Sequence, residues 1–178
     1  LLAKKLGVEN DKVILTISRL AKSEKYKGYD KVIQALPAIV KEIKSVKYIL
    51  IGNGDDSPRI EQLIKDLKME NYVVRPGYIP EEELVDYYNL CDVFAMPSKG
   101  EGFGFVFLEA LACGKPVIAG NQDGSGEAVL NGELGIKSGE FIEQAKEGYM
   151  FPDTYLLPPN ASASAVVKKM KANFDNKY

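Results

Sequence analysis

The feature that most constrains the fold of this chain is a repeated alternation of short, mainly apolar runs with longer amphipathic segments. The runs are predicted strands, at residues 13–18, 48–51, 72–79, 92–97 and 116–119. Segments with helical periodicity lie between them, at residues 29–44, 58–68, from 80 and from 103. Runs without alternating polar positions are typical of strands buried on both faces of a parallel sheet. The pattern therefore predicts an α/β fold, a doubly wound parallel sheet of the Rossmann-like kind.

The length of the chain fits a single domain. Its 178 residues can bury a sizeable core, and they contain no internal repeat or low-complexity tract that would indicate a second unit. Residues 1–6 have the pattern of the last turns of a helix, and the chain begins with Leu1 rather than methionine. We therefore interpret residues 1–178 as one domain and expect a further region upstream of it.

Charge and residue usage exclude several classes of function. The 23 basic and 25 acidic residues give a net charge of −2 without a basic block, which argues against a nucleic-acid surface. The chain has no histidine, so His-based acid–base chemistry and His-rich metal sites are excluded. Cys91 and Cys113 have no metal-ligand or redox spacing and are predicted to be reduced and buried. No apolar run approaches the roughly 20 residues that span a bilayer, and no secretion signal is evident, so we expect a cytoplasmic location.

A glycine-rich loop follows the fourth predicted strand and leads into a helix. Its glycines alternate with other residues, at Gly100, Gly102 and Gly104. Glycine lets a backbone adopt positive φ and approach a ligand closely. The start of the following helix offers unpaired N–H groups and the positive end of its dipole, which together favour a phosphate. The loop therefore predicts a phosphate-binding site.

Two glutamates lie on either side of the expected phosphate position. Glu109 lies about a turn and a half into the helix, roughly 7–8 Å from its start at 1.5 Å per residue. That distance is close to the separation of a diphosphate from the ribose of the same nucleotide. Glu101 lies on the loop itself. The apolar positions of this helix recur at Phe105, Leu108, Leu111 and Ala112. The arrangement indicates a bound nucleotide, with one acid at the ribose and one at the group beyond the diphosphate.

The loop after the first predicted strand is rich in cations. In an open parallel sheet, the carboxyl ends of the strands are where ligands bind. Arg19 and Lys27 lie in this loop and could clamp a diphosphate, the arginine through its planar fork and the lysine as a point charge. Lys22 and Lys25 lie between them and are expected to be solvated.

A second glycine turn, Gly52-Asn53-Gly54, follows the second predicted strand. It begins like the dinucleotide-binding pattern G-x-G-x-x-G, but the third glycine is replaced by Ser57. The chain also lacks an acid about 20 residues later, which that pattern uses for the ribose. A NAD-type oxidoreductase is therefore a disfavoured alternative.

The residues around the two glutamates resemble a known family. The segment 101–119 reads E-G-F-G-F-V-F-L-E-A-L-A-C-G-K-P-V-I-A. It is similar to the E-x7-E signature of retaining nucleotide-sugar glycosyltransferases of the GT-B fold, and more closely to the glycosyl transferases group 1 family, which includes bacterial mannosyltransferases and sucrose synthase. The resemblance covers roughly residues 1–136. It implies that the chain is the donor-binding half of a GT-B fold whose N-terminal acceptor domain is absent.

The resemblance also implies roles for individual residues. The order Arg19-Leu20, then Lys27-Gly28-Tyr29-Asp30, is similar to the family's R-L…K-G-x-D segment, in which the two cations contact the donor phosphates. Arg19, Lys27 and Glu101 are thus the candidate catalytic residues, with Glu101 holding sugar hydroxyls rather than acting as a covalent nucleophile. The candidate donor-binding residues are Gly52, Gly54, Tyr78, Gly102, Phe103, Gly104, Phe105, Val106 and Glu109.

The function expected from the resemblance is transfer of a hexosyl unit from a GDP-, UDP- or ADP-sugar to an acceptor hydroxyl with retention of configuration. Polysaccharide, lipopolysaccharide or glycolipid synthesis would use such a reaction. The acceptor, a glycan or a lipid, would be held by the missing domain, and the whole protein could associate peripherally with a membrane. There is no D-x-D ligand pair, so we expect neither a metal nor another cofactor. The isolated domain is expected to be inactive. The alternative to an enzyme is a non-catalytic nucleotide-sugar-binding module.

The resemblance weakens in the C-terminal part of the chain. Glu127 begins a predicted short helix and fits either a contact to the donor sugar or plain helix capping. The family pattern that begins at residues 132–135 resumes only at residues 148–153, so the residues between resemble an insertion. A last helix is predicted over residues 161–174.

Overall fold

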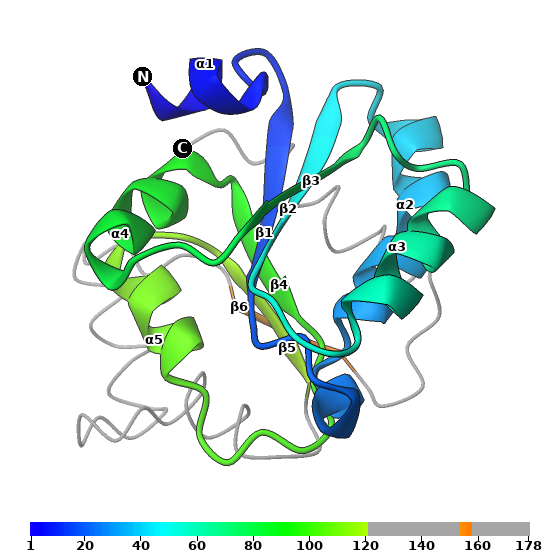
Figure 1. Ribbon diagram of the computed structural model, residues 1–178. Coiled ribbons are helices and arrows are strands. Elements are labelled where there is room, and N and C mark those ends of the chain that lie inside the picture. The colour runs from blue at the N-terminus through cyan, green and yellow to red at the C-terminus, as the bar shows by residue number, and fades with distance from the viewer. Residues whose placement is uncertain (121–153, 158–178) are drawn as a thin grey trace.

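A single parallel sheet forms the centre of the protein (Figure 1). The computed structural model describes residues 1–120 and 154–157. The sheet has six strands in the order β3-β2-β1-β4-β5-β6. The strands are β1 Lys12–Ile17, β2 Val46–Ile51, β3 Val73–Gly77, β4 Val93–Met96, β5 Val117–Gly120 and β6 Thr154–Leu157. This arrangement confirms the predicted doubly wound parallel α/β fold and adds β6, which the sequence analysis did not predict.

The strand order reverses direction between β1 and β4. β1 pairs with β2 along its whole length, from Lys12 opposite Val46 to Ile17 opposite Ile51. β4 pairs with the other side of β1 at Ile14 and Leu15. The chain crosses from one half of the sheet to the other between β3 and β4, so the loops that leave the carboxyl ends of β1 and β4 lie beside each other. In such sheets the crevice between these loops is the usual ligand position.

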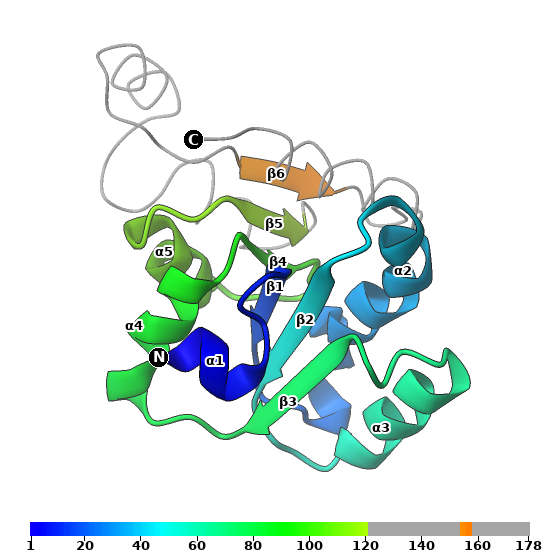
Figure 2. The same cartoon turned by 90° about the horizontal axis from the view of Figure 1, so that it is seen from above.

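Helices cover both faces of the sheet (Figures 1 and 2). α2 and α3 lie on one face, and α1, α4 and α5 lie on the other. Their bounds are α1 Leu2–Leu6, α2 Tyr29–Glu42, α3 Ser57–Asp66, α4 Glu81–Leu90 and α5 Phe105–Ala112. Of the helices within the described residues, none has the length and apolar character needed to cross a membrane.

Alternate strand residues enter two separate cores. Ile14, Tyr48 and Val93 belong to the core beneath α2 and α3. Leu15 and Phe94 belong to the core beneath α4 and α5. All five side chains are essentially inaccessible to solvent. The central strands are therefore buried on both faces, which is why their sequences are apolar without alternation.

The structure differs from the sequence expectations in three places. The cation-rich loop contains a 3₁₀ helix, η1, over Lys22–Lys27. In α5, the buried side chains are Phe107 and Ala110, whereas Phe105 is 69% exposed. The helix therefore forms as expected, but its buried side chains differ from the apolar positions read from the sequence, and Phe105 is its first residue, directly after Gly104. Cys91 is buried as expected, but Cys113 is only half-buried.

Candidate functional site

Two loops meet at the carboxyl edge of the sheet, one after β1 and the other after β4. The backbone N–H of Lys99 donates to the carbonyl of Tyr26 at 2.8 Å and joins them. Gly28, with φ of +76°, lies against Pro97 so closely that a Cβ would come within 2.4 Å of the Pro97 carbonyl oxygen. Glycine is therefore required where the loops cross. This contact places the cation-rich loop beside the glycine-rich loop.

The three candidate catalytic residues come together in this region. Lys27 Nζ lies 3.7 Å from Glu101 Oε2 and 3.5 Å from Glu24 Oε2. Arg19 forms an ion pair with the other oxygen of Glu24. The side chains of Glu24, Lys27 and Glu101 are 11%, 14% and 16% exposed, while that of Arg19 is 79% exposed. The result is a cluster of two cations and two carboxylates in which only the Arg19 guanidinium is largely exposed to solvent.

Sequence reasoning missed Glu24 as a member of this cluster. It lies in η1 between the two cations along the chain, and it contacts both of them in space. Its position between two cations, in a loop expected to bind a ligand, could have indicated this role from the sequence. Its carboxylate therefore brings Arg19 and Lys27 close to each other.

The glycine-rich loop ends at the start of α5. Gly104 caps this helix with φ of +85°, and a Cβ there would come within 2.5 Å of the Phe107 ring. A Cβ on Gly102 would meet nothing within 4 Å. Phe103 and Phe105 pack edge to face with their ring centroids 5.2 Å apart. The loop therefore leaves open space beside Gly102 and directs the first N–H groups of α5 toward the carboxyl edge.

Glu109 lies farther along α5, on an exposed part of its surface. Its Oε2 accepts a hydrogen bond of 2.6 Å from the hydroxyl of Tyr88 in α4. Burial of the tyrosine and the adjacent carboxylate raise the pKa of the Tyr88 hydroxyl, so that it stays a proton donor. The sequence predicted Glu109 but gave no sign of this partner.

The remaining candidate residues, Gly52, Gly54 and Tyr78, follow β2 and β3. A Cβ on Gly52 would lie 1.9 Å from the Ser18 carbonyl oxygen, and one on Gly54 would lie 2.1 Å from the Leu20 carbonyl oxygen. Both glycines therefore let this turn pack against the end of β1. With its amide oriented to satisfy both groups, Asn53 accepts from the Tyr78 N–H at 3.2 Å and donates to the Gly52 carbonyl at 3.0 Å. The Tyr78 side chain is 75% exposed.

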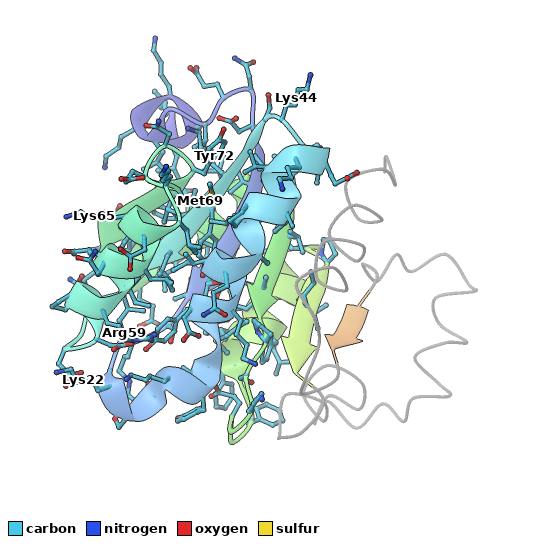
Figure 3. All side chains as sticks on the ribbon, turned by 90° about the vertical axis from the view of Figure 1, so that its right-hand side faces the viewer. Lys22, Lys44, Arg59, Lys65, Met69 and Tyr72 are labelled. Atoms are coloured by element: carbon cyan, nitrogen blue, oxygen red, sulfur yellow. The ribbon has the colours of Figure 1, made fainter. Side chains whose placement is uncertain are left out.

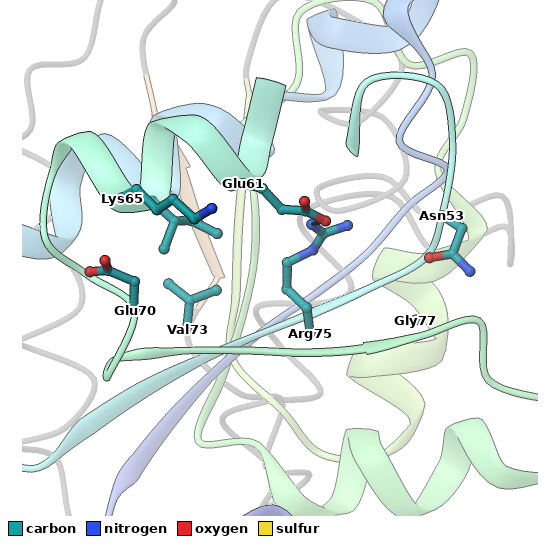
Figure 4. Close-up of a pocket in the computed structure, with 8 residues that line it drawn as sticks. Asn53, Glu61, Lys65, Glu70, Val73, Arg75 and Gly77 are labelled. Carbon is teal, nitrogen blue, oxygen red and sulfur yellow. Dashed lines mark hydrogen bonds and ion pairs between the residues drawn. The ribbon is translucent and has the colours of Figure 1, made fainter. Parts of the chain in front are cut away.

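A pocket of about 380 Å³ that was not predicted lies between α3 and the edge strand β3 (Figure 4). Arg75 crosses it, with Nη1 donating to Glu61 at 2.8 Å and Nη2 to Ser57 Oγ at 3.1 Å. Asn53 and Gly77 form the end of the pocket nearest the carboxyl edge. Opposed charges line it, Arg75 and Lys65 against Glu61 and Glu70.

A metal site is not evident in the described part of the chain. Within residues 1–120 and 154–157, no three Cys, Asp or Glu side chains gather as a metal ion would require. Glu127 and the helix predicted over residues 161–174 lie outside the described residues.

A family model and several relatives of known name all match this chain and indicate the same family. The family model described as glycosyl transferases group 1 matches residues 2–150. A GDP-mannose-dependent alpha-(1-6)-phosphatidylinositol monomannoside mannosyltransferase of Mycolicibacterium smegmatis is 35% identical over an alignment of 139 residues that covers 74% of this chain and 36% of that protein. An alpha-monoglucosyldiacylglycerol synthase of Acholeplasma laidlawii is 32% identical over 136 residues, 76% of this chain and 33% of that protein.

Solved structures share the fold. Anabaena Alr3699/HepE, crystallised in complex with UDP, matches 98% of this chain and 42% of its own, with a TM-score of 0.75 and 26% identity. This chain thus spans about a third of the length of the two relatives above and less than half of that structure. The family match over most of the chain, together with the shared fold, shows that this chain belongs to the glycosyl transferases group 1 family of GT-B glycosyltransferases.

Proposed function

We propose that this chain binds the nucleotide diphosphate sugar of a retaining hexosyl transfer to an acceptor hydroxyl. The observation that carries the proposal is the cluster of Arg19, Lys27 and Glu101 at the point where the strand order reverses, beside the start of α5. Cations and a helix start that face one crevice provide charge stabilisation for a leaving diphosphate.

Different residues beside the carboxyl edge would bind different parts of the donor. Arg19 and Lys27 would bind the diphosphate and stabilise the charge that develops as the sugar leaves, assisted by the N–H groups of residues 104–106. Glu101 would accept hydrogen bonds from the sugar hydroxyls. Glu109, about a turn and a half along α5, would accept them from the ribose.

The turns after β2 and β3 would lie beside the nucleotide base. The Tyr78 N–H already donates to the Asn53 side chain. The base would therefore contact other backbone groups of these turns and the exposed Tyr78 ring. The relatives support a purine or a pyrimidine equally, because one is named as GDP-mannose-dependent and a structural neighbour was crystallised with UDP.

The acceptor would bind to residues outside this chain, since the match covers only about a third of each of these relatives. Two relatives are named as a phosphatidylinositol monomannoside mannosyltransferase and an alpha-monoglucosyldiacylglycerol synthase, and these names support a lipid or glycan acceptor. The cations of the crevice would replace a divalent metal in binding the diphosphate. The chain alone would then bind donor but transfer little or no sugar.

The test is calorimetric titration of UDP, GDP, ADP and their glucose and mannose conjugates into wild type and Glu109→Ala, with and without EDTA. We expect one family of diphosphates to bind regardless of EDTA, and at least tenfold more weakly to the variant, about 1.4 kcal/mol. Glu82→Ala, which removes an exposed acid in the first turn of α4, is the matched control and should bind as wild type does.

Binding that EDTA abolishes would contradict the metal-free site. Equal binding by wild type and Glu109→Ala would contradict the ribose assignment. If the folded chain instead bound NADH and no sugar nucleotide, the oxidoreductase alternative would replace this proposal.

A further inference from the structure

We propose that Tyr88 is a positioning residue for nucleotide binding, which holds one oxygen of Glu109 so that the other faces the ribose. This inference rests on the proposed function, because it assumes that Glu109 binds the ribose hydroxyls. The role of Tyr88 is inferred from its hydrogen bond to Glu109, which joins α4 to α5 across 21 positions of the chain.

The side chains of Tyr88 and Glu109 differ in their exposure to solvent. Tyr88 is 2% exposed, whereas Glu109 is on the exposed surface of α5. The 2.6 Å hydrogen bond between them engages Oε2 and does not involve Oε1. A glutamate on a helix surface otherwise samples several rotamers, and a ligand must overcome that freedom when it binds.

The Tyr88 hydroxyl is held in place by the packing of its ring. Its ring packs on Phe94 of β4 with centroids 5.8 Å apart, and Phe94 packs edge to face on Phe107 of α5 at 5.7 Å. Phe107 lies two residues before Glu109 in the same helix. The ring stack therefore fixes the separation between the hydroxyl and the turn of α5 that carries the carboxylate.

Tyr88 is a neutral hydrogen-bond donor beside a charged carboxylate. The Tyr88 hydroxyl remains protonated over the range in which a carboxylate is ionised, because burial and the neighbouring Glu109 raise its pKa. It therefore acts as the donor in its hydrogen bond to Glu109. A hydrogen bond from a neutral donor also leaves the negative charge of the carboxylate available to the ligand.

The test compares a ribonucleoside diphosphate with its 2′,3′-dideoxy analogue. Calorimetry of UDP, GDP and ADP and their dideoxy forms gives the ratio of the two dissociation constants for the diphosphate that binds. We expect Tyr88→Phe, which keeps the ring stack, to reduce this preference for ribose at least fivefold. Tyr87→Phe removes a hydroxyl from the neighbouring buried tyrosine of α4 and should leave the ratio unchanged.

The outcomes separate this inference from the proposal on which it rests. An unchanged ratio in Tyr88→Phe, with a ratio near one in Glu109→Ala, would overturn the positioning role alone. A ribose preference that survives in Glu109→Ala, or no diphosphate binding to the folded chain, would overturn both.

A second variant serves if Tyr88→Phe does not fold. Glu109→Asp keeps the charge on an exposed surface but withdraws it from Tyr88 by one methylene. Retention of the ribose preference in Glu109→Asp would overturn the positioning role.

Discussion

At the scale of single residues, the crevice depends on positions where only one kind of residue fits. Gly52 has φ of +124° and lies against the Ser18 carbonyl, so the ends of β1 and β2 approach closely there. Glu24 is required for a different reason, since its carboxylate contacts both candidate phosphate-binding cations. The glycine shapes the edge of the crevice, and the glutamate orients its charges.

We expect Gly52→Ala to lower the free energy of unfolding by about 2–4 kcal/mol, because the new Cβ would meet backbone 1.9 Å away at a φ that alanine rarely adopts. Gly114→Ala is the control. It also has positive φ, +69°, but a Cβ there meets nothing within 4 Å, so it should cost only about 1 kcal/mol. Urea unfolding measures both, and equal losses would show that the close approach is not what requires glycine at residue 52.

At the scale of elements, a buried carboxylate joins the helices on one face of the sheet. Asp56, directly before α3, accepts a hydrogen bond of 3.0 Å from Tyr29 in α2 and one of 2.6 Å from Arg59 in α3. Arg59, which is labelled in Figure 3, also donates to Asp30 of α2 at 3.0 Å. The hydrogen bonds that Asp56 accepts, chiefly those from Arg59, lower the pKa of its carboxyl group. The network sets where α3 begins relative to the cation-rich loop.

This network predicts a pH dependence of stability. A lowered pKa in the folded state means that ionised Asp56 stabilises the fold fully above the pKa of the unfolded chain, about 3.9, and that this contribution is lost as pH falls through the lower folded value. Asp56→Asn should therefore cost about 3 kcal/mol at pH 7. The difference from wild type should shrink as the pH falls below about 4.

Urea unfolding of both proteins between pH 7 and pH 2.5 measures that difference. Asp86→Asn, at an exposed position of α4, is the matched control and should be neutral throughout. A difference between wild type and Asp56→Asn that stays constant with pH would contradict a role for the charge of Asp56.

At the scale of the whole molecule, the two cysteines lie at different depths in the same layer. Cys91, at the end of α4, is 1% exposed and donates to the Tyr88 carbonyl at 3.3 Å. Burial raises the pKa of its thiol to about 12. Cys113, at the end of α5, is half-buried. The reactivity of Cys91 therefore reports the opening of the core between α4 and the sheet.

We expect iodoacetamide at pH 8 to modify Cys113 in the native protein and Cys91 only through unfolding, because the thiolate is the reactive form. Mass spectrometry of the Cys113→Ser variant across a urea series isolates Cys91. Its rate should rise in parallel with the unfolded fraction. Native-state modification of Cys91 as fast as that of Cys113 would contradict the packing of this layer.

The sequence alone was sufficient to predict the fold class and most candidate site residues. Strands that are apolar on both faces and helices with regular periodicity are local properties, so residues 13–18 and 29–44 predict a buried strand and a covering helix without any tertiary information. Arg19, Lys27 and Glu101 were likewise indicated by their positions in motifs after strands, and the structure places them together.

Tertiary structure alone decided the partners of those residues. The bond from Tyr88 to Glu109 depends on how α4 and α5 pack on the sheet, and that packing also selected Phe107 rather than Phe105 as the buried residue of α5. The pocket beside Arg75 and the close approach of Gly52 to Ser18 likewise depend on the spacing of neighbouring elements. Periodicity and motifs describe each segment separately, whereas these contacts join segments far apart in the chain, and their geometry is set only when the whole sheet is assembled.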